Sequence, residues 1–303
     1  MQDFPHIICA ERQALPDFIK GHKVGITRQV EQIGAVLFRG FEINTAEKLD
    51  EVVAAYGEPG FTYEKSLSNA VRVNLTPRVF TANEAPPDVS IYLHHEMAQT
   101  PLYPSKLFFG CLLAPESGGA TPICRSDWVL DRLKSEQPEL VRSFREKGVT
   151  YQHVMPAEPD PESGQGRSWK DTLSVTSKKA AEARLAELNY KWDWQPDGSL
   201  LVQTPRLDAI RDLGHGEESF FNQLIAAFRG WKDKRNDPSK SVRHGDGSAI
   251  DVDALGRAIE IADELTYDLN WQTGDVVLVD NFRVMHGRRP YTGKRKVVAS
   301  LVA

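Results

Sequence analysis

Apolar and polar positions alternate at helical spacing near the start of the chain. Apolar side chains recur at this spacing over residues 15–33, which predicts an amphipathic helix that ends at Gly34. Residues 35–41 are then mostly apolar and predict a short strand that ends at a glycine. A second helix is expected over residues 46–56, with Thr45 as its N-cap and a glycine directly after it.

The rest of the chain alternates short apolar runs with helical patterns and turn residues. Strands are expected over residues 91–93, 106–113, 149–153, 266–271, 275–280 and 296–302. Helices are expected over residues 126–134, 138–147, 180–188, 220–231 and 251–265. A hairpin is predicted over residues 192–204, around the turn Pro196-Asp197-Gly198. Turns or loops are expected over residues 116–119, 155–167 and 235–248.

Short strands at both ends of the chain, with helices and loops between them, are typical of one fold class. This arrangement predicts an α+β fold whose jelly-roll core, a double-stranded β-helix, is decorated by helices. We expect a single domain over residues 1–303. The region at about 148–265 would be a large insertion that covers one mouth of the barrel.

Composition excludes several function classes. Hydrophobic residues make up 41% of the chain and charged residues 26%, as in ordinary globular proteins. The formal net charge is -5 with acids and bases interspersed, so no nucleic-acid partner is expected. No apolar segment reaches the length of a membrane span, and the first residues do not resemble a signal peptide. Cys9, Cys111 and Cys124 lack CxxC spacing and cannot all pair, which favours a reducing compartment and a cytoplasmic location.

Three residues with metal-binding side chains occur in the order His94, Glu96, His286. In a strand, residues i and i+2 point to the same face, so His94 and Glu96 can reach one ion while His95 points away. His286 follows the strand expected over residues 275–280, and we expect it on a loop at the same barrel mouth. Two imidazoles and one carboxylate leave adjacent positions free, as in non-haem Fe(II) oxygenases. The same ligands suit hydrolytic zinc, although the helical HExxH motif is absent.

Two further polar side chains suit a ligand that carries a carboxylate. Thr121 follows the tight turn at Gly118-Gly119, and Arg295 stands at the head of the last expected strand. A guanidinium beside a hydroxyl inside a barrel can bind a carboxylate through charge-assisted hydrogen bonds. Taken singly, Thr121 also reads as a turn residue and Arg295 as a solvated charge.

These motifs, in this order and spacing, resemble the taurine-dioxygenase superfamily of Fe(II)/2-oxoglutarate oxygenases. Within it, the chain is most similar to the branch that contains clavaminate synthase-like enzymes and syringomycin-pathway hydroxylases. The resemblance spans nearly the whole chain. It rests on residues 34–41 (GAVLFRGF), 93–97 (LHHEM), 118–122 (GGATP), 274–281 (GDVVLVDN) and 285–288 (MHGR).

By position, the resemblance implies a metal site and a co-substrate site. His94, Glu96 and His286 would bind Fe(II), while Thr121 and Arg295 would bind the distal carboxylate of 2-oxoglutarate. O2 would be the other co-substrate. Related halogenases have a small residue at the position of Glu96, so its carboxylate argues against halogenation.

The resemblance also implies a reaction and a substrate class. It implies hydroxylation of an unactivated C–H bond in a small molecule, an amino acid or amino-acid derivative, free or bound to a carrier protein, in secondary metabolism. Desaturation, cyclisation or oxidative dealkylation at the same iron are alternatives, and so is a jelly-roll binding protein without catalysis. Some relatives carry a second Arg where this chain has Ala299, so any contact made by that Arg must be absent or replaced.

Residues that bind the substrate are marked less clearly. Arg288 and Arg289 suit a carboxylate or phosphate, although surface exposure explains them equally well. Asn83-Glu84 could bind an amine. The candidate pocket walls, which plain core packing explains better, are Met97, Phe109 and Trp271. The candidate lids are the loops 155–167 and 235–248.

Overall fold

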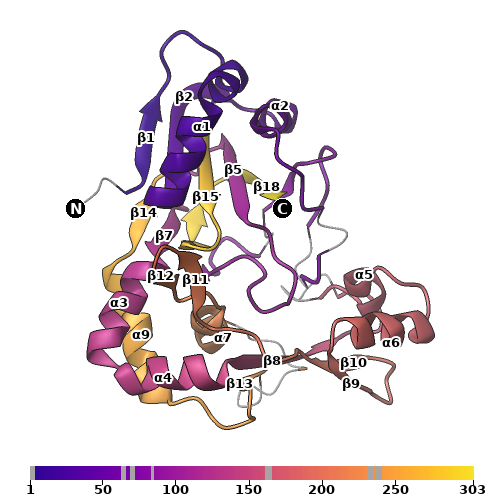
Figure 1. The fold of residues 1–303 in the computed structure, drawn as a ribbon. Coiled ribbons are helices and arrows are strands. Elements are labelled where there is room, and N and C mark those ends of the chain that lie inside the picture. The colour runs from indigo at the N-terminus through magenta and orange to yellow at the C-terminus, as the bar shows by residue number, and fades with distance from the viewer. Residues whose placement is uncertain are drawn as a thin grey trace.

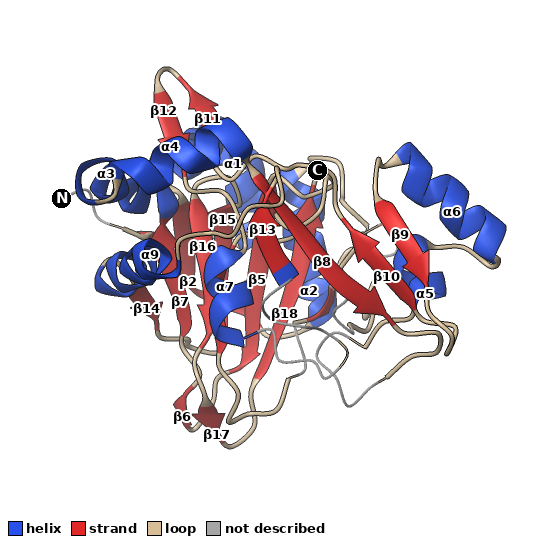
Figure 2. Ribbon diagram, turned by 90° about the horizontal axis from the view of Figure 1, so that it is seen from below, coloured by secondary structure: helices blue, strands red, loops and turns tan. Residues whose placement is uncertain are grey.

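Two β-sheets at the centre of the molecule are surrounded by helices (Figures 1 and 2). The computed structural model describes residues 4–62, 66–68, 72–82, 85–160, 166–230, 235 and 241–303. The larger sheet has the strand order β1-β2-β15-β5-β18-β3, so segments from both ends of the chain pair with each other. Its strands are β1 (His6–Cys9), β2 (Ala35–Ile43), β3 (Phe80–Thr81), β5 (Lys106–Leu113), β15 (Gly274–Asp280) and β18 (Lys296–Val302).

The smaller sheet has the strand order β14-β7-β16-β4, and its paired strands are antiparallel. Its strands are β4 (Ile91–His94), β7 (Thr121–Arg125), β14 (Tyr267–Leu269) and β16 (Val284–Arg288). Leu107 of the larger sheet and Ile123 of the smaller sheet belong to one buried apolar cluster. The two sheets therefore enclose a shared interior, and the expected jelly-roll core is confirmed.

Alternation along β15 shows how one strand contributes to two cores. Val277 belongs to the cluster between the sheets, whereas Leu278 belongs to a cluster shared with helices α1 (Leu15–Ile33) and α2 (Ala46–Tyr56). Successive residues of a strand point to opposite faces. A strand that is covered on both faces must therefore be apolar nearly throughout, and every residue of β15 is buried.

The ends of the first two helices follow their local sequence. Helix α1 ends at Gly34, whose φ is 97° and whose N–H donates to the carbonyl of Val30 at 2.8 Å. Helix α2 begins after Thr45, whose hydroxyl accepts from the N–H of Lys48 at 3.2 Å. Both expected boundaries are confirmed.

Four helices pack on the outer face of the smaller sheet. Their apolar side chains join Leu93 of β4, Cys124 of β7 and Met285 of β16 in one buried cluster. These helices are α3 (Ser126–Glu136), α4 (Pro138–Lys147), α7 (Leu224–Gly230) and α9 (Val252–Glu264). The smaller sheet is thereby covered on both faces.

A third sheet, with the strand order β13-β8-β10-β9, carries two short helices on a further apolar cluster. Its elements are β8 (Val149–Met155), β9 (Lys191–Trp194), β10 (Leu200–Gln203), β13 (Val242–His244), α5 (Trp169–Leu173) and α6 (Lys178–Glu187). Two short antiparallel pairs complete the fold. The hairpin β11 (Arg211–Gly214) with β12 (Glu217–Ser219) is local, whereas β6 (Ser117–Gly118) pairs with the distant β17 (Tyr291–Thr292). The hairpin expected over residues 192–204 is confirmed as β9 and β10.

Several local predictions differ from the structure, three of them outside the candidate site. β2 continues through Gly40 to Ile43 because its register with β15 holds on both sides of a bulge. The helix expected from residue 220 begins at Leu224. The polar loop expected over 235–248 contains strand β13, because its backbone pairs with β8 whatever its side chains are. Residues 161–165 and 236–240, which belong to the two expected loops, and residue 231, the last of the helix expected from 220, lie outside the described residues.

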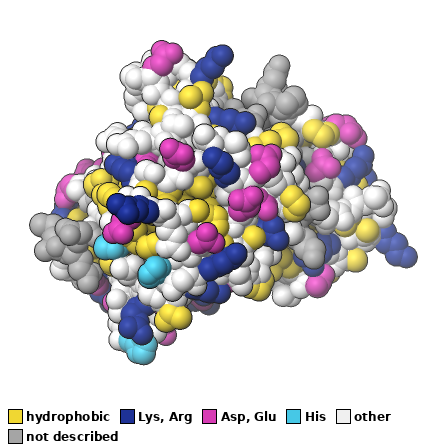
Figure 3. Space-filling model, turned by 90° about the horizontal axis from the view of Figure 1, so that it is seen from above, with side chains coloured by type: hydrophobic (Ala, Val, Ile, Leu, Met, Phe, Trp, Pro, Cys, Tyr) yellow, Lys and Arg dark blue, Asp and Glu magenta, His cyan; other side chains and the backbone are white. Residues whose placement is uncertain are grey.

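Acidic and basic side chains are interspersed over the face seen in Figure 3. This distribution follows the mixed charge pattern of the sequence. Among the described residues, no helix has both the length and the apolar composition that a membrane-spanning segment needs.

Candidate metal and co-substrate site

His94 and His286 lie directly opposite each other on neighbouring strands. His94 is the last residue of β4, and its Cα partner across the ladder is His286 in the middle of β16. The two ring centroids are 4.5 Å apart. The expectation that His286 lies on a loop beyond a strand is therefore wrong. The segment Val284–Arg288 is a strand because it pairs with β7 on one side and β4 on the other.

Glu96 reaches the same point from a turn. β4 ends at His94, and Met97 has a φ of 60°, which breaks the strand geometry assumed for positions 94 and 96. The convergence of His94 and Glu96 was predicted, but through the wrong local structure. Both side chains nevertheless face one cavity, because the turn redirects the chain directly after β4.

The intervening His95 points away from this cavity, as expected. Its Nδ1 lies 2.5 Å from the carbonyl oxygen of Asn281, and its ring lies 4.8 Å from that of Phe221. Because a carbonyl can only accept, Nδ1 carries the proton. Burial lowers the pKa of His95 to about 3, so its imidazole is neutral.

The three candidate ligands form a compact set. One ligand atom from each of His94, Glu96 and His286 lies within 4.8 Å of the others. The Nδ1 of His94 donates to the carbonyl of Tyr92 at 2.8 Å, which leaves its Nε2 lone pair for a metal ion. Burial, followed by the nearby His286, lowers the pKa of His94 to about 4, so it is neutral as a ligand must be. The donor set therefore fits a divalent transition metal.

Arg72 is a residue of this site that sequence reasoning missed. Its Nη2 donates to both carboxylate oxygens of Glu96, at 3.0 and 3.2 Å. Burial alone would raise the pKa of Glu96, but Arg72, together with His286, holds that pKa well below its usual value. Arg72 stands outside every motif quoted above, so no local signal marks it.

The structure brings the two predicted carboxylate-binding residues together. Nη2 of Arg295 lies 3.5 Å from the hydroxyl oxygen of Thr121, and its Nε donates to the carbonyl of Gly119 at 3.0 Å. The indole N–H of Trp271 also donates to the Thr121 hydroxyl, at 2.9 Å. Because that oxygen accepts from Trp271 and faces Arg295, its own proton is available for a ligand.

Arg295 is a partly buried cation without an acidic partner among the described residues. Burial, reinforced by the neighbouring Arg288, lowers the pKa of Arg295 to about 10. The guanidinium stays charged at neutral pH. A bound carboxylate would restore the electrostatic balance that burial removes.

One cavity is lined by the three candidate metal ligands, by Arg72 and by the pair of Thr121 and Arg295. Its lining residues are Arg72, Ala82, Ile91, His94, Glu96, Phe109, Thr121, His286, Gly287, Arg288, Arg295 and Val297. The empty space inside it is about 520 Å³, including its open mouth.

Only some of the residues that the sequence offered as possible substrate contacts line the cavity. Phe109 lines the cavity, Trp271 contacts it through Thr121, and Met97 is core. Arg288 lines the cavity, but its guanidinium donates to backbone carbonyls of residues 85, 86 and 89. Arg289 pairs with Asp268 at the surface. Asn83-Glu84 lies outside the described residues, and no described residue of the loops 155–167 and 235–248 lines the cavity.

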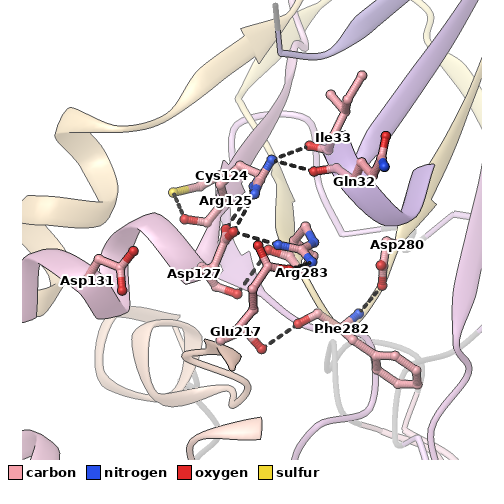
Figure 4. Close-up of polar contacts among 12 residues, drawn as sticks. Gln32, Ile33, Cys124, Arg125, Asp127, Asp131, Glu217, Asp280, Phe282 and Arg283 are labelled. Carbon is pink, nitrogen blue, oxygen red and sulfur yellow. Dashed lines mark hydrogen bonds and ion pairs between the residues drawn. The ribbon is translucent and has the colours of Figure 1, made fainter. Parts of the chain in front are cut away.

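A buried ion-pair network holds the start of the strand that carries His286 (Figure 4). Arg125 and Arg283 both bind the carboxylate of Asp127, and Nη1 of Arg283 lies 2.8 Å from it. Nη1 of Arg125 also donates to the carbonyls of Gln32 and Ile33 at the end of α1. Helix α1, β7 and β16 are thereby joined at one point, which fixes the direction in which β16 enters the site.

Comparison with known proteins agrees with this geometry. The chain matches the family described as Taurine catabolism dioxygenase TauD, TfdA family over residues 3–301. The chain belongs to this family. It is 42% identical over 284 residues to a clavaminate synthase-like protein of Arabidopsis thaliana, with 93% of this chain and 86% of that protein covered. It is 28% identical over 308 residues to the dapdiamide synthesis protein DdaC of Enterobacter agglomerans, with 95% and 87% covered.

Solved structures of low sequence identity share the fold. The non-heme iron oxygenase OrfP, in complex with Fe, succinate and (3R,4R)-dihydroxy-L-Arg, superposes with a TM-score of 0.55 at 15% identity. The match covers 95% of this chain and 80% of that chain. Membership of the TauD, TfdA family makes this chain a 2-oxoglutarate-dependent non-haem iron dioxygenase that uses Fe(II), 2-oxoglutarate and O2. The chemistry expected from the sequence is confirmed, and the zinc alternative is not supported.

Proposed function

We propose that this TauD-family dioxygenase hydroxylates an unactivated C–H bond of an amino acid or amino-acid derivative in secondary metabolism. In this proposal His94, Glu96 and His286 bind Fe(II), and Thr121 with Arg295 binds the distal carboxylate of 2-oxoglutarate. One observation carries the proposal. Three ligand atoms within 4.8 Å of one another face a cavity that Thr121 and Arg295 also line.

The metal supplies the activation of O2 and the removal of a hydrogen atom, while the protein supplies position and exclusion of water. His94 is oriented by its bond to the Tyr92 carbonyl, and His286 by its place in β16. Glu96 and His286 are buried, which keeps bulk water away from the ligands. Phe109 lies 5.1 Å from the His286 ring and limits its rotation.

The co-substrate assignment rests on charge and hydrogen-bond direction. 2-Oxoglutarate has one carboxylate beside its keto group, which can chelate a metal, and a second carboxylate at the other end. Arg295 offers charged donors and Thr121 offers a hydroxyl proton at one site in the cavity. Together these groups match the second carboxylate.

The substrate class rests on the relatives together with the cavity. DdaC takes part in dapdiamide synthesis by its name, and the OrfP structure contains a dihydroxylated arginine. The three candidate metal ligands of this chain line one cavity, where such a molecule would lie. We propose a free amino acid or a carrier-bound form of one, since a tethered substrate would present the same side chain at the mouth.

Cysteine chemistry supports a cytoplasmic location. Cys9, Cys111 and Cys124 are all free thiols. Burial raises the pKa of Cys111 to about 12, which keeps that thiol protonated and unreactive. Free thiols are usual where the environment is reducing.

Substrate-stimulated release of succinate tests the proposal. Free and carrier-bound amino acids are screened with Fe(II), 2-oxoglutarate and O2, and products are analysed by mass spectrometry. Gain of one oxygen atom supports hydroxylation, whereas loss of two hydrogen atoms indicates desaturation or ring formation, and loss of an alkyl group indicates dealkylation. Release must vanish in His94→Ala and persist in His22→Ala, a matched change of an exposed histidine on α1. Tight binding of an amino acid without any succinate would support a binding protein instead.

A further inference from the structure

The guanidinium of Arg72 is hydrogen-bonded to the carboxylate of Glu96, which is one of the proposed metal ligands. Its Nη2 lies 3.0 Å from one oxygen of Glu96 and 3.2 Å from the other, so it straddles both. The second of these oxygens is also 3.5 Å from Nε2 of His286, on the side where a shared metal ion would lie. The side chain of Arg72 is only 8% exposed, and it lines the same cavity as the three ligands.

A divalent ion at this point competes with Arg72. The ion takes lone pairs of Glu96 and brings two positive charges next to a guanidinium that already uses both oxygens. The low polarity of a buried cavity strengthens that repulsion. We therefore expect the guanidinium to leave Glu96 when the metal binds, whereas a fixed orienting residue would stay.

The backbone beside Arg72 restricts where the guanidinium can go. The N–H of Val73 donates to the Thr81 hydroxyl at 3.0 Å, and the N–H of Thr81 donates to the Val73 carbonyl at 2.9 Å. Thr81 belongs to β3, which pairs with β18. This connection holds the backbone at the cavity wall, so a change of partner at Arg72 would be a movement of its side chain.

The aromatic ring of Phe80 indicates along which wall of the cavity the Arg72 side chain would turn. The Arg72 guanidinium lies 5.2 Å from the ring centre of Phe80, a cation–π contact. Phe80 is the cross-strand partner of Ala299 on β18. Ala299 itself is buried and projects no charge. The cation at this wall of the cavity therefore comes from Arg72.

The charges that line the cavity indicate what kind of ligand the Arg72 guanidinium could bind. Among the described residues, the lining contains three guanidinium groups, those of Arg72, Arg288 and Arg295, and one carboxylate, that of Glu96. Arg288 is held by backbone carbonyls, and Arg295 lies at the proposed 2-oxoglutarate site. With a divalent metal and a dianionic co-substrate bound, the described residues of the lining would leave an excess of positive charge. A further anion is the ligand that would balance it.

We propose that Arg72 binds an acidic group of the organic substrate, a carboxylate above all, and pairs with Glu96 only while the metal is absent. This inference rests on the proposed function, because it needs the metal at Glu96. It makes metal and substrate binding reciprocal. The metal frees Arg72 for the substrate anion, and the anion holds Arg72 away from Glu96.

Competition between the metal and Arg72 for Glu96 is tested by the Mn(II) affinity, which is measured without turnover by electron paramagnetic resonance of the free ion. Arg72→Gln should bind Mn(II) about tenfold more tightly than the wild type when no other ligand is present, because a charged competitor is removed. Weaker binding in Arg72→Gln would show that Arg72 orients Glu96 permanently and would overturn the proposal. Arg72→Lys keeps the charge and should resemble the wild type. Arg78→Gln is the matched control, because the Arg78 side chain is 47% exposed and pairs with Asp50 of helix α2, away from the cavity.

Thermal shifts of the protein loaded with Mn(II) and N-oxalylglycine, an analogue of 2-oxoglutarate, test the binding of the substrate anion by Arg72. The common L-amino acids and their N-acetyl derivatives are compared with the matching carboxamides. Carboxylates should raise the Tm of the wild type more than carboxamides do, and Arg72→Gln should lose this difference while Arg72→Lys and Arg78→Gln keep it. A preference that survives in Arg72→Gln, or no preference in the wild type, overturns the assignment.

The two proposals fail in different ways. If the wild type does not bind Mn(II), or if His94→Ala binds it equally well, the metal site of the proposed function is wrong. If Mn(II) binds through His94 but Arg72→Gln does not bind it more tightly, only the role of Arg72 is wrong.

Discussion

The side-chain amide of Asn281 binds the backbone of Glu96 on both sides, although the two residues are 185 positions apart in sequence. Its oxygen accepts from the Glu96 N–H at 2.7 Å, and its nitrogen donates to the Glu96 carbonyl at 3.0 Å. The same nitrogen donates to the carbonyl of Pro104 at 2.8 Å. This clamp closes the turn that aims the Glu96 carboxylate at His94 and His286, which makes Asn281 a positioning residue.

Loss of the clamp should weaken metal binding. Asn281→Ala removes three buried hydrogen bonds and leaves their backbone partners unsatisfied, so we expect a loss of about 3 kcal/mol in the free energy of unfolding. We also expect Mn(II) affinity to fall by about tenfold or more, as for other residues that orient ligands. Urea unfolding and Mn(II) titration measure the two effects.

Two other asparagine variants sharpen that experiment. Asn281→Asp keeps the acceptor for the Glu96 N–H but places a carboxylate oxygen against the Glu96 and Pro104 carbonyls, so it should be as damaging as alanine. Asn270→Ala is the matched control, because its exposed side chain only donates to the Asp268 carbonyl at 3.3 Å. Unchanged Mn(II) affinity in both Asn281 variants would contradict the positioning role.

Alanine substitutions at two glycines, Gly34 and Gly21, should change the free energy of unfolding in opposite directions. Gly34 has a φ of 97°, and a Cβ there would lie 2.5 Å from a methyl group of Val284 on β16. Gly34→Ala should therefore lower the free energy of unfolding by about 2 kcal/mol or more. Gly21 lies inside α1 with open space around it, so Gly21→Ala should raise that free energy by up to about 1 kcal/mol. Thermal unfolding of the two variants checks both signs, and a stable Gly34→Ala protein would contradict the packing described.

The carboxylate site should respond to changes of charge and of hydroxyl group separately. Arg295→Gln should raise the Kd for 2-oxoglutarate in the Mn(II)-loaded protein by about tenfold or more, because a charged hydrogen bond is lost. Thr121→Val removes the hydroxyl and should raise the Kd less. Calorimetric titration measures both. Arg289→Gln is the control, since Arg289 pairs with Asp268 at the surface, and an equal effect there would exclude a specific role for Arg295.

Asp280 predicts a pH dependence of stability. Burial raises the pKa of its carboxyl from 3.8 to about 6 in the folded protein. The protonated carboxyl of Asp280 makes its full contribution to the free energy of unfolding below about pH 3.8. This contribution is lost as the pH rises through about 6. Asp280→Asn, which keeps the oxygen that accepts from the N–H of Phe282, should therefore gain stability relative to the wild type between pH 4 and pH 7. At pH 7 the gain in the free energy of unfolding should be about 3 kcal/mol.

Urea unfolding at several pH values measures that difference. The m-values of the two proteins serve as the control, because equal values show that both unfold through the same transition. A difference between variant and wild type that stays flat from pH 4 to pH 7 would exclude a buried, destabilising charge at Asp280.

Local sequence predicted those parts of the fold that depend on local causes. Gly34 and Thr45 marked helix ends because their own backbone or side chain completes the helix. The apolar runs of β5, β15 and β18 marked strands that are covered on both faces. The order of His94, Glu96 and His286 marked the residues that the fold brings together.

The remaining features depend on partners that are distant in sequence. Strand β16 was not predicted from the sequence because it contains the charged residue Arg288. This charge can be buried because the backbone carbonyls of residues 85, 86 and 89 accept hydrogen bonds from it. The turn at Glu96 depends on Asn281, and the polar strand β13 depends on pairing with β8. Arg72 joins the site through a contact with Glu96 that no local pattern signals.

The central claim is that His94, Glu96 and His286 bind one iron ion on which 2-oxoglutarate chelates. Anaerobic titration of the protein with Fe(II) and 2-oxoglutarate, followed by visible absorption, tests it most directly. We predict a weak metal-to-ligand charge-transfer band in the wild type and in His22→Ala, and no band in His94→Ala. A band that persists in His94→Ala, or none in a wild-type protein shown to hold both iron and 2-oxoglutarate, would contradict the account.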